Sequence, residues 1–205
     1  MPRKTRRPKP APRAVDEERS DLRIVGGTLR GRKLLYSGDE RTRPMKERVR
    51  EAVFNLIGPR VVGTHAIDLF AGTGALGLEA LSRGAATATL VEQHFPTADI
   101  IRRNVEMLGL AERSEVYPGN AFIWSQRQLP PVDRPWLVFS SPPYVFYTER
   151  EADMLALLSR LFESAPPAST FVVEADERFD MSHLPHPSGW QIRAYPPAIV
   201  AIQTS

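Results

Sequence analysis

Short apolar runs alternate with amphipathic helical segments through residues 65–174, and this alternation leaves few folds open to the chain. Strands joined in sequence by helices form a parallel sheet with right-handed crossovers, so we predict an α/β doubly wound sheet. The expected strands are 65–70, 86–92, 114–117, 136–140 and 170–174, and the expected helices are 75–83, 96–108, 121–128 and 149–164.

The pattern changes near the carboxyl terminus. The strand-like runs 190–195 and 198–203 have only Pro196-Pro197 between them, which leaves no room for a helix. They are expected to pair as an antiparallel hairpin at the edge of the sheet. An antiparallel last strand on a parallel Rossmann-like sheet is the pattern of class I methyltransferases, and residues 59–205 are assigned to this domain. Apart from the expected strand at 170–174, residues 166–188 receive no clear assignment.

The charge of the chain is unevenly distributed. Residues 1–20 carry seven Lys/Arg against three Asp/Glu, residues 21–50 carry nine against four, and residues 51–205 carry eleven against seventeen. A basic front end on an acidic body is expected to meet a polyanion, although a solvated tail without a partner would have the same charge.

The first fifty-eight residues fall into two parts. Residues 1–20 are rich in Pro and charge, and are predicted to be a disordered basic tail because they bury too little apolar surface. Residues 21–58 are predicted to form an extension, with a β-hairpin in 22–36 that turns near Gly26–Gly27 or Gly31. A helix follows, beginning at Pro44 and ending before Gly58-Pro59.

Several classes of protein are excluded. No apolar run approaches the ~20 residues that span a bilayer, and no apolar segment follows the basic start, as a secretory signal would require. The sequence has no cysteine, so it has no disulfide or thiolate ligand. Its four histidines are scattered and suggest no metal site. We expect a cytoplasmic protein that acts as a monomer.

The sharpest local signal follows the first strand of this domain. Asp68 ends that strand, and Gly72, Gly74 and Gly77 then satisfy G-x-G-x-x-G before the next helix. This spacing serves nucleoside ligands in general, because glycine lets a ligand approach the backbone closely. Glu92 ends the second strand, where a carboxylate accepts hydrogen bonds from ribose hydroxyls. Asp68 suits the ammonium group of S-adenosyl-L-methionine and would repel the pyrophosphate of a dinucleotide.

A second signal follows the fourth strand, at the edge where a doubly wound sheet places its ligands. Ser141, Pro142, Pro143 and Tyr144 form a turn in which the prolines give up amide donors and leave carbonyl acceptors exposed. Together with the Ser141 hydroxyl, these acceptors suit an exocyclic base amine, and Tyr144 can stack on the base, aided by Phe146 or Tyr147. The predicted contribution is mainly positioning.

With these residues assembled, the chain resembles the RsmD family of ribosomal RNA guanine-amine methyltransferases. The resemblance rests on RIVGG-x-x-RGRKL, RP-x-x-x-RVREA-x-FN, DLFAGTGALGLEALSRGA and VE. It implies methylation of the N2 amine of a guanine in 16S ribosomal RNA, free or in the assembling small subunit. The implied cofactor site contains Asp68, Phe70, Ala71, Gly72, Thr73, Gly74, Glu92, Gln93, Asn120 and Ala121. The implied RNA-binding residues, in an extension from Arg23 to Arg50, are Arg23, Arg30, Arg32, Lys33, Arg43, Lys46 and Arg48.

Two positions depart from the family pattern. Asn120 follows Gly119 where an acidic residue is usual, and an amide can still contact adenine. Ser141 replaces the usual Asp or Asn, and a neutral acceptor makes a weaker hydrogen bond than a charged one. Ser141 therefore leaves open an amine of cytosine or adenine in RNA or DNA, or an RNA-binding module without turnover. A nicotinamide-dependent oxidoreductase is the weakest alternative, because it accounts for neither the Ser-Pro-Pro-Tyr turn nor the basic extension.

Overall fold

The computed structural model describes residues 22–36, 38 and 44–205. A seven-stranded sheet has the order β3-β2-β1-β4-β5-β7-β6. Strands β1 to β5 run parallel, and β7 is antiparallel to both β5 and β6. The strands are β1 His65–Asp68, β2 Thr87–Glu92, β3 Ser114–Pro118, β4 Trp136–Ser140, β5 Thr170–Asp176, β6 Gln191–Tyr195 and β7 Ala198–Thr204. The predicted doubly wound sheet with antiparallel last strands is confirmed.

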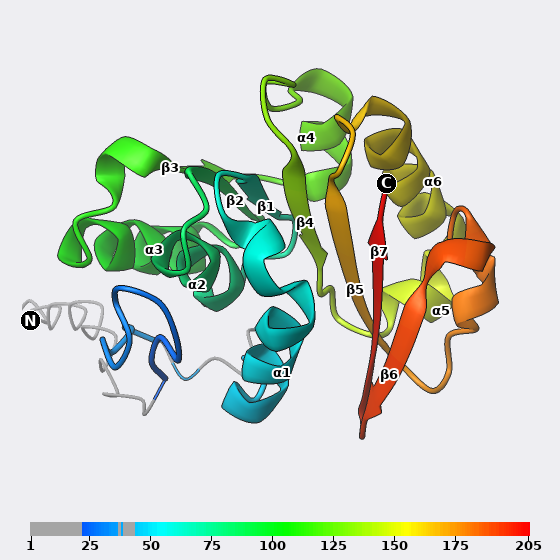
Figure 1. Ribbon diagram of the computed structural model, residues 1–205, viewed down its shortest axis with the longest axis horizontal. Coiled ribbons are helices and arrows are strands. Elements are labelled where there is room, and N and C mark those ends of the chain that lie inside the picture. Colours follow the sequence, from blue (N-terminus) through cyan, green and yellow to red (C-terminus); the bar gives the residue numbers. More distant parts are fainter. Residues whose placement is uncertain (1–21, 37, 39–43) are drawn as a thin grey trace, which may run out of the picture.

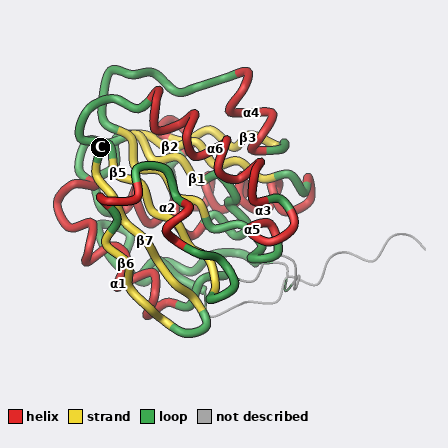
Figure 2. Tube along the Cα trace, turned by 90° about the vertical axis from the view of Figure 1, so that its right-hand side faces the viewer, coloured by secondary structure: helices red, strands yellow, loops and turns green. Residues whose placement is uncertain are grey.

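Helices cover both faces of the sheet (Figures 1 and 2). α1, α2 and α3 pack their apolar residues on one face, while α4 and α6 pack on the other. The helices are α1 Glu47–Ile57, α2 Ala75–Ser82, α3 Phe95–Met107, α4 Ala121–Arg127, α5 Phe146–Glu149 and α6 Glu151–Ser164. Because the central strands have helices on both sides, β1 and β4 are buried along their whole length. No helix of the described residues has the length and apolar character needed to cross a membrane.

The expected hairpin of residues 22–36 is reduced to one antiparallel bridge, between Arg23 and Lys33. Three further backbone hydrogen bonds join the two arms, from Ile24 to Arg32, from Gly31 to Ile24 and from Leu34 to Leu22, but no strand extends from them. Other backbone groups of the segment bond to helices. Val25 donates to Glu79 of α2 at 2.8 Å, and Leu35 donates to Asn104 of α3 at 2.7 Å. The segment therefore lies across α2 and α3 as a loop (Figure 1).

Helix α1 begins later than predicted. Lys46 has an extended backbone with φ −55° and ψ 138°, so the helix starts at Glu47, and Pro44 lies outside it. The RNA-binding extension was predicted to end at Arg50, and the structure does not place this residue at the surface. Arg50 is fully buried, lies 3.6 Å from Glu79 and donates to the carbonyl of Arg23 at 2.5 Å. The guanidinium of Arg50 therefore interacts inside the protein, where it connects α1 to α2 and to the amino-terminal segment.

Residues 166–188, left without a clear assignment, contribute to the core. After β5, Phe179, Met181 and Leu184 are buried in a cluster with Tyr147 and Met154 of the α5–α6 region. Two short 3-10 turns follow β5, η4 Met181–His183 and η5 Pro187–Gly189. This stretch thus packs, together with the α5–α6 region, against β5 and β7.

Candidate active site

One cavity of about 830 Å³ opens at the carboxyl ends of the parallel strands. It brings together most of the residues predicted from separate motifs, which are Phe70, Ala71, Gly72, Thr73, Glu92, Gln93, Asn120, Ala121, Ser141, Pro142, Pro143, Tyr144 and Lys46. Asp68 and Gly74 do not line it. The volume is that of a site for a small organic ligand.

Glu92 is fixed in position by the backbone. Its carboxylate accepts the amide of Gly72 at 2.8 Å and the amide of His94 at 2.7 Å, and the residue is 8% exposed. A carboxylate has about four acceptor positions, so the remaining ones can accept a pair of vicinal hydroxyls. Glu92, the last residue of β2, therefore holds the glycine loop in place through the amide of Gly72.

Asp68 lies behind the glycine loop. Its Oδ2 accepts the amide of Gly77 at 3.0 Å, while its buried Oδ1 has no hydrogen-bond partner among the described residues. Burial raises the pKa of Asp68 to about 7, the Gly77 amide opposes this rise, and the charge of Glu92 adds to it. An unpartnered buried carboxylate oxygen favours a cationic group nearby.

Asp68→Asn is expected to flatten the dependence of the unfolding free energy on pH between about 4 and 7. The pKa of Asp68 is above its ordinary 3.8 in the folded protein, so its contribution to stability is full below pH 3.8 and is lost as pH rises through about 7. The wild type should lose up to about 1.4 kcal/mol per pH unit relative to the variant across this range. Urea unfolding at several pH values measures the difference, and parallel curves would contradict it.

Glycine was predicted in the loop because a ligand must approach its backbone, and the structure gives a different reason for two of the three positions. A Cβ on Gly77 would lie 2.9 Å from Leu90 of β2, and one on Gly74 would lie 3.1 Å from Ile101 of α3. Gly74 also has φ +75°, a conformation that favours glycine. These two glycines let α2 approach β2 and α3, whereas Gly72, φ +52°, lines the cavity.

Asn120 caps α4. Its Oδ1 accepts the amides of Phe122 at 2.9 Å and Ile123 at 3.3 Å, so the acceptor half of the amide is engaged in the helix. The Nδ2 group is the half that remains for a ligand. The Nδ2 group is a donor, so it suits an acceptor nitrogen of a purine ring. The acidic residue usual at this position in the family would instead accept a hydrogen bond from an exocyclic amine.

The turn after β4 carries an interaction that the sequence interpretation missed. Glu174 of β5 lines the cavity, and its carboxylate accepts hydrogen bonds from the hydroxyls of Ser141 and Tyr144. The strand ending at Glu174 was predicted without a role for the acid. The sequence did contain a signal for this role, because Glu174, like Glu92, is an acid at the end of an apolar run predicted to be a strand.

Aromatic rings form part of the cavity wall. Phe70 and Phe146 line it, with ring centroids 6.0 Å apart, and Phe122 packs against both. Tyr147, one of the two rings suggested to help hold the base, is 1% exposed and hydrogen-bonded to Ser140, so it cannot stack on a ligand. Phe146 lines the cavity, so its ring remains a candidate to stack on the base.

Residues just before and within α1 form another wall of the cavity, which sequence motifs did not place there. They are Pro44, Met45, Lys46 and Val49. The end of β6, the turn that follows and the start of β7 add Tyr195, Pro197 and Ala198 to the lining. The extension is thus part of the site, and the ammonium-bearing side chain of Lys46 lies among the residues that line the cavity.

Five of the other predicted RNA-binding residues are on the surface. Arg23, Arg30, Arg32, Lys33 and Arg48 are exposed, and Arg43 lies outside the described residues. Arg23 forms an ion pair with Glu47 at 3.2 Å, and Arg32 donates to the carbonyl of Met107 at 3.0 Å.

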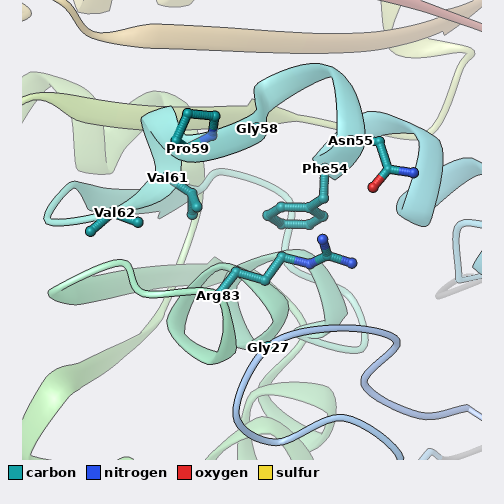
Figure 3. A pocket seen from close by; sticks show the side chains of 8 residues that line it. All are labelled: Gly27, Phe54, Asn55, Gly58, Pro59, Val61, Val62 and Arg83. Carbon is teal, nitrogen blue, oxygen red and sulfur yellow. The ribbon is translucent and has the colours of Figure 1, made fainter.

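A second depression, of about 380 Å³, lies where the amino-terminal segment meets α1 and α2. Figure 3 shows the guanidinium of Arg83 facing the ring of Phe54, at 4.9 Å from its centroid. It shares no lining residue with the larger cavity. Within the part of the chain that the structure describes, no group of three or more His, Asp or Glu side chains is placed to hold a metal ion.

The sheet order and this cavity define a class I S-adenosylmethionine-dependent methyltransferase fold, and the cavity residues fit the cofactor of that class. Glu92 can hold ribose hydroxyls, and Asn120 and the aromatic wall can hold the base. Asp68 does not line the cavity, and its unpartnered Oδ1 is buried behind the glycine loop.

Comparison with known proteins gives the family. Residues 22–193 match the family described as Conserved hypothetical protein 95, and the chain belongs to that family, which is the RsmD family. "Putative rRNA methyltransferase YlbH" of Bacillus subtilis is 38% identical over 100 residues, which cover 49% of this chain and 54% of that protein. "Ribosomal RNA small subunit methyltransferase D" of Escherichia coli is 41% identical over 123 residues, 60% of each chain.

The chain thus spans little more than half the length of these curated relatives. The solved structure "Putative methyltransferase yhhF from Escherichia coli" is similar over a longer range, with a TM-score of 0.72 and 30% identity. That similarity covers 89% of this chain and 97% of the other.

Proposed function

We propose that the chain transfers a methyl group from S-adenosyl-L-methionine to the N2 amine of a guanine in small-subunit ribosomal RNA. The observation that carries the proposal is that one cavity joins Glu92, an acceptor for ribose, to the Ser141–Tyr144 turn, a set of acceptors for an amine. The relatives' printed names, which specify ribosomal RNA, support the substrate class. The guanine comes from the resemblance to the RsmD family.

The bound cofactor supplies an electrophilic methyl group on a sulfonium. The residues of the chain hold the two reactants in line, which is the main source of acceleration in a transfer between two bound molecules. Glu92 and Asn120 fix the nucleoside end. Pro142, which lines the cavity, offers its carbonyl as an acceptor for the amine, whereas the Pro143 carbonyl accepts the amide of Phe146 at 2.9 Å. Tyr144 offers its ring as a platform for a base that has left its stack.

We propose that the exposed cations of the amino-terminal segment contact phosphates of the RNA. Such contacts position a substrate and give little sequence discrimination. Lys46, just before α1, lines the cavity, and Arg48 is exposed in the first turn of α1. We assign both to contacts with the RNA strand that carries the target base. We also propose a cytoplasmic monomer that meets the ribosomal RNA free or in the assembling subunit.

Lys46→Ala/Arg48→Ala is expected to weaken RNA binding and to reduce the slope of log K against log salt by about 0.7–0.9 for each phosphate that the variant no longer neutralises. Affinity for S-adenosylmethionine should stay unchanged. Arg127→Ala on α4, an exposed cation on the other face of the sheet, is the matched control. Fluorescence anisotropy with an rRNA fragment at several salt concentrations measures the slopes. Equal slopes for the wild type and the double variant would remove these residues from the interface.

The proposed activity is tested with labelled S-adenosylmethionine and small subunits, or RNA extracted from them, from a strain lacking this protein. Transfer of label to the RNA supports the proposal. Tight RNA binding without release of S-adenosylhomocysteine would favour a binding module instead, and label on DNA alone would change the substrate.

A further inference from the structure

We propose that Glu174 is the charged group of the amine site, acting through Ser141 as a positioning residue and proton acceptor. The inference rests on the proposed function, and it assigns to Glu174 of β5 the charge that Ser141 lacks.

The register of the sheet brings the two residues together. Ser140 of β4 pairs with Val173 of β5 in a parallel ladder. The next residues, Ser141 just after β4 and Glu174 within β5, therefore lie level with each other near the carboxyl ends of the parallel strands. Glu174 is only 6% exposed, yet it lines the cavity, so its carboxylate faces the site and not bulk water.

Two hydroxyls point at this carboxylate. Ser141 Oγ donates to Oε2 of Glu174, and Tyr144 Oη donates to Oε1 at 2.8 Å. Among the residues that the structure describes, no Lys or Arg forms an ion pair with Glu174. A buried carboxylate held only by hydroxyl donors keeps its acceptor strength for the site.

The direction of the first hydrogen bond decides what Ser141 can do. A serine hydroxyl has one hydrogen, and here that hydrogen is directed to Glu174. The lone pairs of Ser141 Oγ are therefore available, and toward a base amine the group acts as an acceptor. The negative charge of Glu174 polarises the hydroxyl and strengthens this acceptor.

The same chain of hydrogen bonds can remove the surplus proton. The lone pair of the amine nitrogen forms the new N–C bond, and the methyl–sulfur bond breaks with its electron pair going to sulfur. The nitrogen then loses one proton to Ser141 Oγ while the hydroxyl proton of Ser141 passes to Glu174. Glu174 later returns that proton to water, so charge and protons balance.

Glu174→Gln removes the charge and keeps the size of the side chain. We expect kcat to fall by about 100-fold, within the range found for a lost acid–base group, with the KM for RNA and the affinity for S-adenosylmethionine changed less than about twofold. Ser141→Asp/Glu174→Gln places a carboxylate directly at the amine and should recover at least about one tenth of the wild-type kcat. Glu177→Gln, at an exposed acid near the end of β5, is the control.

Single-turnover methylation of small-subunit RNA, with calorimetry for the cofactor and thermal unfolding for each variant, gives these quantities. Wild-type kcat in Glu174→Gln, or no recovery in a folded double variant, would overturn the assignment. If Glu174→Gln does not fold, Glu174→Asp replaces it, and a folded Glu174→Asp should keep more activity than Ser141→Ala; the reverse order overturns the assignment. Wild-type protein that leaves the RNA unmethylated overturns the proposed function, and this inference with it.

Discussion

Glu79→Gln should lower the free energy of unfolding by about 3–5 kcal/mol, because it leaves a buried guanidinium without its counter-charge. Glu79 and Arg50 both have fully buried side chains, and Glu79 also accepts the side chain of Arg83 at 2.7 Å and the backbone of Val25 at 2.8 Å. Burial lowers the pKa of Arg50, and the charge of Glu79 opposes that shift. The acid is therefore what allows Arg50 to stay charged in the core.

Urea unfolding of a mutant cycle separates the ion pair from simple packing. Arg50→Met should cost less than Glu79→Gln, because Glu79 keeps Arg83 and the Val25 amide as partners. In Arg50→Met/Glu79→Gln much of the loss should be recovered, since no unpaired buried charge is left. Glu112→Gln at an exposed site is the control. Additive losses in the cycle would contradict the coupling.

Glu92→Ala should weaken the binding of S-adenosylmethionine by about 100-fold. Hydrogen bonds to a charged acceptor contribute about 1.5–3 kcal/mol each, and tenfold in affinity corresponds to about 1.4 kcal/mol. The variant also frees the amides of Gly72 and His94, so the glycine loop loses its anchor. Isothermal titration calorimetry measures the affinity, and Glu106→Ala at an exposed site of α3 is the control.

A ligand without ribose hydroxyls separates the two roles of Glu92. A 2′,3′-dideoxy analogue of S-adenosylhomocysteine should bind more weakly than S-adenosylhomocysteine to the wild type. Glu92→Ala should bind the two ligands with similar affinity. A preference for the hydroxylated ligand that survives in Glu92→Ala would show that another group holds the ribose.

The sequence predicted those parts of the site that follow from strand ends. Glu92, Asn120 and Ser141 each lie at or just after the end of a strand, and parallel strands bring their carboxyl ends to one edge. Their convergence on one cavity needs only the order of elements along the chain. The roles of Gly74 and Gly77 could not be read in this way, because their neighbours Leu90 and Ile101 are set by helix packing.

Interactions that depend on register or on the path of a loop were missed. Glu174 reaches Ser141 because of the pairing between β4 and β5, and the length of two strands does not give that pairing. The burial of Arg50 depends on where α1 lies against α2, and its acidic partner is Glu79. The hairpin of residues 22–36 is shorter than predicted, because part of its backbone donates hydrogen bonds to side chains of α2 and α3.

Identification of the modified nucleoside is the decisive test of the proposed activity. Small-subunit RNA from a strain lacking this protein is incubated with the purified chain and S-adenosylmethionine, then digested and analysed by mass spectrometry. We expect N2-methylguanosine at one position, and we expect none after incubation with Glu92→Ala. Methylcytidine, methyladenosine or no new nucleoside would contradict methylation of a guanine N2 amine by this chain.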